Sequence, residues 1–257
     1  MARHRTKPGF AGSVGIAAAA LAFTVPATPA GGQIPDEFTN LQFFDEEISR
    51  GELIGYMRQF SFALGVRCQY CHSGGDGVSF EGVEFASDDK PEKLRARYML
   101  EMARTINSTL LVDVPERRSP NVDVGCATCH RGIARPRMIA DVIRETITAD
   151  GAEAGVTKYR ELHDEYSDGW SYDFGEWAIN DLASEYGRAE DPETAAVLMR
   201  MNSEFHPGSP SVWTGLGDAE NLAGNRDAAI AAYQKGLELS PDNPQILRRL
   251  EELGVGG

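Results

Sequence analysis

The cysteines of this 257-residue sequence constrain its structure more than any other feature. All four lie in pairs with two residues between them, and a histidine directly follows each pair. The two strings are Cys68-Gln69-Tyr70-Cys71-His72 and Cys126-Ala127-Thr128-Cys129-His130. This is the attachment pattern of c-type haem, in which both thiols form thioethers to the porphyrin and the histidine coordinates the iron. The sequence therefore predicts two covalently bound haem c groups, with His72 and His130 as iron ligands.

Three other kinds of cysteine site compete with this prediction. The halves of a zinc site usually lie closer than the 54 residues between Cys71 and Cys126, and zinc does not require a histidine after both pairs. The cysteines of an exported protein can instead form disulfides. A Cys-x-x-Cys pair can also be a redox dithiol, but neither pair is surrounded by the βαβ pattern of a thioredoxin-like fold. Haem attachment remains the favoured interpretation.

The second axial ligand of each iron decides between electron transfer and ligand chemistry. Downstream of the motifs only His163 and His206 remain, in a different kind of sequence, so we expect methionine in this role. Met57 lies in a stretch whose apolar residues follow a helical period, just before a turn at Gly65. A helix here would fold Met57 back over the first haem.

A second helix is expected over residues 94–111, announced by Asp89 as a capping residue and by Pro91 in the first turn. It carries Met99 and Met102, three residues apart on one face. Filling a core is the usual role of methionine on such a helix. The residues alone do not decide which of the two is the second ligand of the second haem.

Three strings of the chain resemble the cytochrome c subunit of photosynthetic reaction centres: Leu53 to His72, Tyr98 to Asn107 and Val124 to Gly132. The resemblance covers roughly residues 40–138. In that family each haem-binding unit is a helix bearing the methionine ligand, a turn, and the Cys-x-x-Cys-His segment. The resemblance therefore implies Met57 as ligand of the first haem and Met99 as ligand of the second. The family subunit has four such motifs, whereas this chain has two.

The first 30 residues have the composition of a targeting segment. Three basic residues precede an apolar stretch at residues 9–25, which is short for a bilayer span. Small residues follow, and we expect cleavage after Ala30, with Ala27 as the alternative. The rival interpretation is a retained N-terminal anchor, which Pro26 disfavours because it closes the apolar run early. The protein is expected to be periplasmic or otherwise exported, with membrane association open.

The C-terminal part predicts tetratricopeptide-like repeats. Seven residues stand at the offsets of one repeat: Trp213, Leu216, Gly217, Gly224, Ala229, Tyr233 and Pro241. A weaker copy lies about 34 residues earlier. Residues 244–253 should form a capping helix with Asn243 as its N-cap. The bland alternative is a pair of ordinary helical hairpins.

These observations predict an all-α chain with a signal peptide (1–30), an irregular helical two-haem cytochrome c domain (31–138) and a short helical repeat domain (139–257). The formal net charge of −14 argues against nucleic acid as a partner. We expect a one-electron carrier rather than an enzyme, acting between redox partner proteins, with a photosynthetic reaction centre as one candidate and the repeats as a docking surface. Two alternatives remain: a peroxidase-like enzyme with one open iron, and a haem-containing assembly module.

Overall fold

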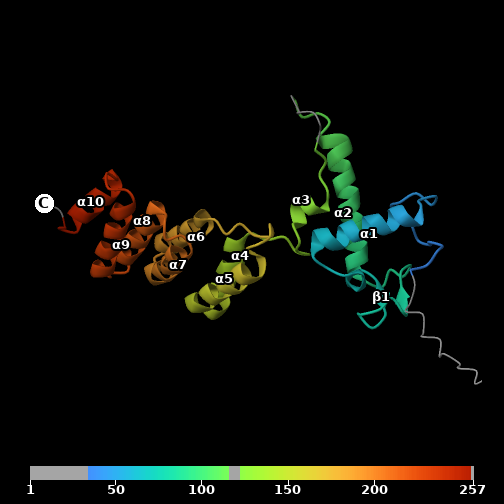
Figure 1. Ribbon diagram of the computed structural model, residues 1–257, viewed down its shortest axis with the longest axis horizontal. Helices are drawn as coiled ribbons and strands as arrows, with labels where there is room; N and C mark the ends of the chain where they lie inside the picture. Colours follow the sequence, from blue (N-terminus) through green and yellow to red (C-terminus); the bar gives the residue numbers. More distant parts are fainter. Residues whose placement is uncertain (1–33, 116–121, 256–257) are drawn as a thin grey trace, which may run out of the picture.

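The computed structural model describes residues 34–115 and 122–255, so the predicted signal segment lies outside the described residues. Within them the fold is all-α, as predicted, apart from one antiparallel pair of two-residue strands. Figure 1 shows an elongated molecule with two groups of helices. We call residues 34–138 the motif region and residues 139–255 the repeat region. In the described parts of the chain, no helix is long and apolar enough to cross a membrane.

In its described residues the motif region contains three α-helices, two short strands, one 3-10 turn and one π-helical turn. These are α1 (Arg50–Leu64), a 3-10 turn (Cys68–Tyr70), β1 (Ser73–Gly74), β2 (Val83–Glu84), α2 (Pro91–Thr105), a π-helical turn (Ile106–Leu110) and α3 (Cys126–His130). The helix expected over residues 94–111 is therefore α2 with its π-helical extension. The expected cap is wrong: Lys90, not Asp89, occupies the N-cap position, and its side chain makes no capping hydrogen bond.

Helix α1 is fixed at both ends. Ser49 and Glu52 form a reciprocal capping box at its start. It ends at Gly65, whose φ of 65° favours glycine and whose missing side chain admits the backbone of Gly132. A Cβ at Gly65 would lie 2.0 Å from the carbonyl oxygen of Gly132. The N–H of Gly132 donates to the carbonyl of Ala63 at 2.9 Å, so the end of α1 is fastened to the chain just after the second motif.

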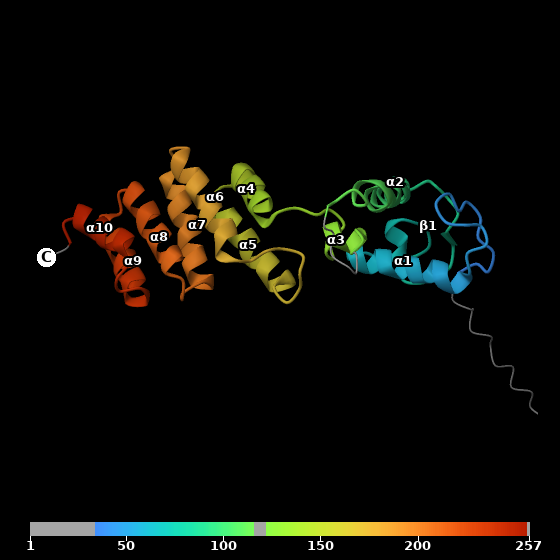
Figure 2. The ribbon, with the colours of Figure 1, turned by 90° about the horizontal axis from the view of Figure 1, so that it is seen from above.

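The repeat region is a row of antiparallel helices, seen edge on in Figure 2. Its helices are α4 (Ile139–Asp150), α5 (Ala152–Tyr166), α6 (Glu176–Arg188), α7 (Pro192–Phe205), α8 (Pro210–Leu222), α9 (Arg226–Leu239) and α10 (Pro244–Glu252). Gly217 of α8 packs under Tyr233 of α9, where a Cβ would lie 2.4 Å from the ring. The carboxamide of Asn243 accepts from the first turn of α10, as predicted.

The two regions differ in their cores. In the described motif region the buried hydrophobic side chains are Leu53, Ala63 and Ile133, and helix α2 buries none. The repeat region has two apolar clusters, a larger one over α4 to α9 and a smaller one between α9 and α10, and several large side chains in them are less than 2% exposed. Among these are Tyr159, Ile143, Ile179, Leu198, Met199 and Tyr233. The motif region therefore folds around a space that its own side chains do not fill.

An extended segment joins α3 to α4 (Figure 2). The two regions also touch at a loop of the repeat region. The loop between α5 and α6 reaches back to the end of the second motif. Ser171 in this loop is buried, and its hydroxyl donates to the carbonyl of Arg131 at 2.8 Å. The ring centroid of Trp170 lies 6.5 Å from that of Phe62 at the end of α1. The repeat region therefore contacts the backbone that follows His130.

Candidate haem-binding site

The first Cys-x-x-Cys-His string forms a tight turn directly after α1. Its 3-10 geometry brings the N–H groups of Cys71 and His72 to the carbonyl of Cys68, at 3.2 and 3.0 Å. The second string forms the single turn of α3, which ends where Arg131 takes the left-handed conformation with a φ of 47°. In both strings the backbone winds about one helical turn from the first cysteine to the histidine. The side chains of these two residues therefore lie close together.

Each motif histidine is oriented by the same kind of hydrogen bond. Nδ1 of His72 lies 3.1 Å from the carbonyl oxygen of Phe85, and Nδ1 of His130 lies 3.1 Å from that of Ile133. Because a carbonyl only accepts, Nδ1 carries the proton in both rings and Nε2 presents its lone pair. Burial lowers the pKa of the His72 imidazole, which favours the neutral ring. Both rings therefore have the tautomer that coordination of a metal through Nε2 requires.

A cavity of about 710 Å³ lies against α1, α2 and the two motifs. Five of the six cysteine and histidine side chains of the motifs line it: Cys68, Cys71, His72, Cys126 and His130. Cys129 is exposed and is not among the lining residues. The volume lies in the range of cofactor sites. The structure therefore brings two strings that are far apart in sequence to one cavity.

The candidate methionines divide at this cavity. Met57 of α1 and Met99 of α2 line it, whereas Met102 does not. Exposure does not separate the two residues of α2, because Met99 is 46% exposed and Met102 is 49% exposed. Only Met99 shares the cavity with the motifs. The choice of Met99 that the family resemblance implied stays a prediction.

The residues around the cavity fit a haem. Its wall carries six phenylalanines: Phe38, Phe43, Phe44, Phe60, Phe80 and Phe85. Such rings suit the apolar faces of a porphyrin, and the scarcity of buried side chains in the motif region leaves it room. Arg58 and Arg67 also line the cavity and provide cations suited to the propionate carboxylates. The four cysteines are free thiols, as attachment requires, and burial raises the pKa of the Cys71 and Cys126 thiols.

A lysine of α2 shares the hydrogen-bond acceptor of His72. Nζ of Lys93 donates to the carbonyl of Phe85 at 2.8 Å and to that of Ser87 at 2.7 Å. The Lys93 side chain is only 13% exposed. The backbone carbonyl that orients the first imidazole is therefore itself held by a largely buried cation.

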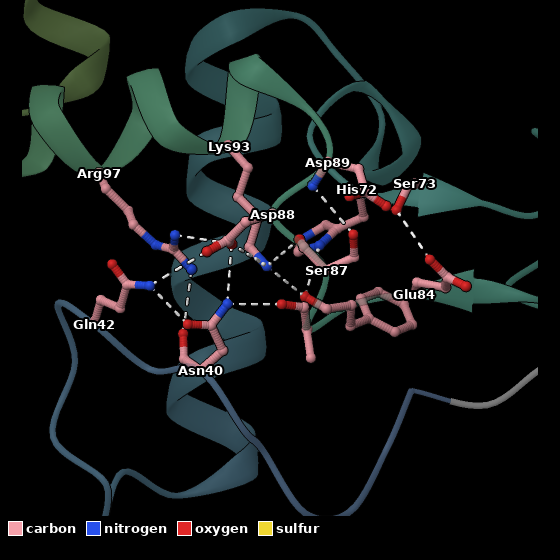
Figure 3. Close-up of polar contacts among 12 residues, drawn as sticks. Asn40, Gln42, His72, Ser73, Glu84, Ser87, Asp88, Asp89, Lys93 and Arg97 are labelled. Atoms are coloured by element: carbon pink, nitrogen blue, oxygen red, sulfur yellow. Dashed lines mark hydrogen bonds and ion pairs between the residues drawn. The ribbon is translucent and has the colours of Figure 1, made fainter.

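The carboxylate of Asp88 lies between Lys93 and Arg97 of α2, and we call these three residues the cluster (Figure 3). This carboxylate lies 3.4 Å from Nζ of Lys93 and 2.8 Å from the guanidinium of Arg97. The carboxamides of Asn40 and Gln42 also donate to it. The hydrogen bond from Arg97 is the main reason that the pKa of Asp88 lies well below its usual range. The cluster ties the N-terminal segment to α2 beside the first motif.

A different set of contacts holds the second motif. The side chain of Asn107, in the π-helical turn after α2, pairs with both backbone groups of Val124, each at 2.8 Å. Val124 stands two residues before Cys126, so Asn107 sets where α3 begins. On the far side, the bond from Ser171 to Arg131 holds the residue after His130. A π-helical turn at such a position is common near functional sites.

Comparison with known proteins places this geometry in a family context. Residues 75–165 match the photosynthetic reaction centre cytochrome C subunit family. The resemblance to this family is confirmed. The matched segment includes the second Cys-x-x-Cys-His string and α2 with both of its methionines, and it begins just after the first string. It implies covalently bound haem c in this part of the chain. Residues 210–253 match the tetratricopeptide repeat family, which confirms the predicted repeat.

Two curated relatives are cytochromes by name. Cytochrome c-554 of Chloroflexus aurantiacus is 40% identical over 84 residues, which cover 32% of this chain and 18% of that protein. The photosynthetic reaction center cytochrome c subunit of Rubrivivax gelatinosus is 31% identical over 99 residues, which cover 35% of this chain and 25% of that protein. The chain thus spans a quarter or less of the length of these relatives.

Solved structures resemble the chain only loosely. The first tetratricopeptide domain of human RPAP3 covers 45% of this chain and 87% of its own at 15% identity, with a TM-score of 0.32. The protein MamA AMB-1 covers 63% of this chain and 76% of its own at 16% identity, with a TM-score of 0.29. The assignment of the repeats therefore rests on the family match and on the packing of the helices.

Several residues of the site were not predicted from the sequence. Lys93, Asn107 and Ser171 each hold a backbone carbonyl next to a motif, and none belongs to a recognisable motif of its own. Asn107 did lie at the end of the string that carries the family resemblance, and an asparagine within a helical pattern is a weak sign of a backbone contact. Nothing in the sequence signals the other two.

Proposed function

We propose that this chain is an exported two-haem c-type cytochrome that carries single electrons between partner proteins. One observation supports this proposal above the others: both motif histidines present Nε2 while Nδ1 is held by a backbone carbonyl, and both line one cavity. Disulfides would not require oriented imidazoles, and among the described residues no three histidine, cysteine or carboxylate side chains come together as a zinc site requires. When bound, haem supplies a one-electron couple that suits a carrier.

Each residue of the site has a role in this proposal. The four motif cysteines tether the two porphyrins, and His72 and His130 are the proximal ligands. Met57 and Met99, which both line the cavity, would be the second ligands of the two irons. Methionine opposite histidine leaves no open coordination site and raises the potential, as a carrier needs. The phenylalanines of the cavity wall exclude water from the porphyrin faces.

The proposed partners are redox proteins. The names of the relatives make a photosynthetic reaction centre a candidate. The proposed division of labour puts haem in residues 31–138 and partner docking in the repeats of residues 139–257. Of the described acidic residues, many lie on exposed helix surfaces of the repeat region, so a partner with a basic docking face would be attracted to it.

The test of cofactor content is the intact mass of the protein after expression with export and haem-attachment machinery. We expect a chain beginning near Gly31 with two haems added. Cys68→Ala and Cys126→Ala should each weaken or abolish one attachment and leave the other. A mass that corresponds to the unmodified chain, or to bound zinc, would end the proposal. Attachment of a single haem in the wild type would overturn the count of two.

The carrier is distinguished from the peroxidase-like alternative by ligand binding. In a carrier with methionine at both irons, carbon monoxide should not bind the reduced wild-type protein. Binding to one haem of the wild type, together with turnover of hydrogen peroxide, would favour the enzyme. Reversible reduction and oxidation of both haems in a redox titration would exclude a purely structural role for them.

A further inference from the structure

We propose that Lys93 tunes the first haem through His72 and raises its reduction potential relative to that of the second haem. The inference rests on the proposed function, because it requires haem at the first motif. Lys93 lines the cavity but is not an iron ligand in this proposal. It acts on the hydrogen bond that orients His72 and through its own charge.

The first effect is that Lys93 and His72 share one hydrogen-bond acceptor. The carbonyl oxygen of Phe85 accepts from Nδ1 of His72 at 3.1 Å and from Nζ of Lys93 at 2.8 Å. A carbonyl has two lone pairs, so both bonds fit. A strong Nδ1–H hydrogen bond makes an imidazole a better electron donor to its metal. An ammonium that draws on the same oxygen weakens this effect, which leaves His72 a weaker donor and favours reduced iron.

The second effect is the charge of the Lys93 side chain. The Lys93 side chain is 13% exposed, so solvent screens its charge only in part. Asp88, at 3.4 Å, offsets it, but the same carboxylate pairs with Arg97 at 2.8 Å. Within the cluster of Lys93, Arg97 and Asp88, two cations face one anion, so the cluster itself carries a net positive charge (Figure 3). Positive charge near a redox centre stabilises the reduced state, so both effects act in the same direction.

The second motif provides the contrast within the same molecule. Nδ1 of His130 makes the same bond at the same distance, to the carbonyl of Ile133. Among the residues that the structure describes, no cationic side chain is hydrogen-bonded to that carbonyl. The second haem is therefore an internal reference for any effect of Lys93.

The experiment is an optical redox titration of the full-length two-haem protein with Lys93→Gln. Glutamine keeps an N–H donor for the Phe85 carbonyl and removes the charge. At a fixed potential we expect the ratio of reduced to oxidised first haem to fall about tenfold, which corresponds to about 59 mV for a one-electron couple. The second haem should shift less. The first haem is identified as the component of the optical spectrum that disappears in the double variant Cys68→Ala/Cys71→Ala.

Three further variants control the result. Lys235→Gln makes the same exchange at a half-exposed lysine of α9 that pairs with Glu238, and it should move neither haem. Lys93→Arg keeps the charge and should stay close to the wild type. Asp88→Asn removes the neighbouring anion and should shift the first haem in the opposite direction, toward easier reduction.

The inference is overturned if Lys93→Gln binds two haems by mass but leaves both potentials unchanged or shifts them equally. If Lys93→Gln fails to fold, Asp88→Asn decides, and a first haem that does not become easier to reduce rejects the inference. A wild-type mass without haem at the first motif is a different result. It would reject the proposed function itself, whereas the outcomes above leave that function standing.

Discussion

The motif region and the repeat region are both built from helices, but different things fill them. Between α4 and α10, side chains such as Leu198 and Met199 pack against neighbouring helices and are almost fully buried. Between α1 and α3 the helices surround a cavity, and α2 buries no side chain. The repeat region thus contains its own apolar core, whereas the motif region leaves its interior to a cofactor.

The difference indicates why the fold of the motif region would depend on a bound cofactor. Burial of apolar area is the dominant favourable contribution to folding, and a region with three buried hydrophobic side chains gains little of it. A covalently held porphyrin supplies apolar surface that cannot dissociate. The repeat region needs no such help, because each helix pair packs on the next.

The largest expected effect tests whether the motif region depends on haem for its fold and the repeat region does not. With all four cysteines replaced by alanine, haem should not be retained, and the motif region should lose its fold while the repeat region keeps its own. Hydrogen exchange followed by mass spectrometry would check this, with fast exchange expected in α1 and α2 and protection retained in α7 and α8. Equal protection of both regions, or equal loss, would contradict the difference that we describe.

Core truncation should affect the repeat region strongly. Leu198 is fully buried, so Leu198→Ala should lower the free energy of unfolding of this region by about 2–5 kcal/mol. The control is Leu110→Ala in the motif region, at a residue that is 61% exposed, and it should stay within about 0.5 kcal/mol. Chemical denaturation followed by circular dichroism measures both. Similar costs for the two variants would argue against a packed core around Leu198.

The methionine variants sharpen the description of the cavity. Met57→Ala should lower the potential of the first haem and allow carbon monoxide to bind there, because a thioether ligand that favours reduced iron is lost. Met99→Ala should do the same at the second haem. Redox titration and the optical spectrum of the reduced protein with carbon monoxide measure both effects.

Met102→Ala is the control for Met99→Ala, because the two residues have similar exposure on the same helix and only Met99 lines the cavity. It should change neither potential nor ligand access. If Met102→Ala opens the second iron instead, the assignment is wrong by one turn of α2. If neither variant changes access because the wild-type iron is already open, the peroxidase-like alternative gains support.

The smallest expected effect concerns the contact between the regions. Ser171→Ala removes the hydrogen bond to the carbonyl of Arg131 and should cost about 0.5–1.5 kcal/mol. Because this bond holds the residue after His130, the spectrum and potential of the second haem should respond and those of the first should not. Ser184→Ala, which removes an exposed hydroxyl bonded only within α6, is the matched control. A response of both haems to Ser171→Ala would show that the contact is not local.

The sequence by itself determined the parts of this protein that depend on neighbouring residues. The two Cys-x-x-Cys-His strings, the helices that carry Met57 and Met99, and the helix N-cap at Asn243 follow from spacings of a few residues. The tetratricopeptide offsets were readable for a related reason, since each repeat packs on the next one in the chain. One such local prediction failed, because Lys90 rather than Asp89 stands at the N-cap of α2.

Only the tertiary structure decided which backbone carbonyls hold the motifs. The partner of His72 is the carbonyl of Phe85, which every residue type would offer equally, so no side chain in the sequence marks it. The bonds from Asn107 to Val124 and from Ser171 to Arg131 join residues 17 and 40 positions apart. Such contacts depend on how distant segments pack, and the local patterns that specify helices and motifs carry no information about that packing.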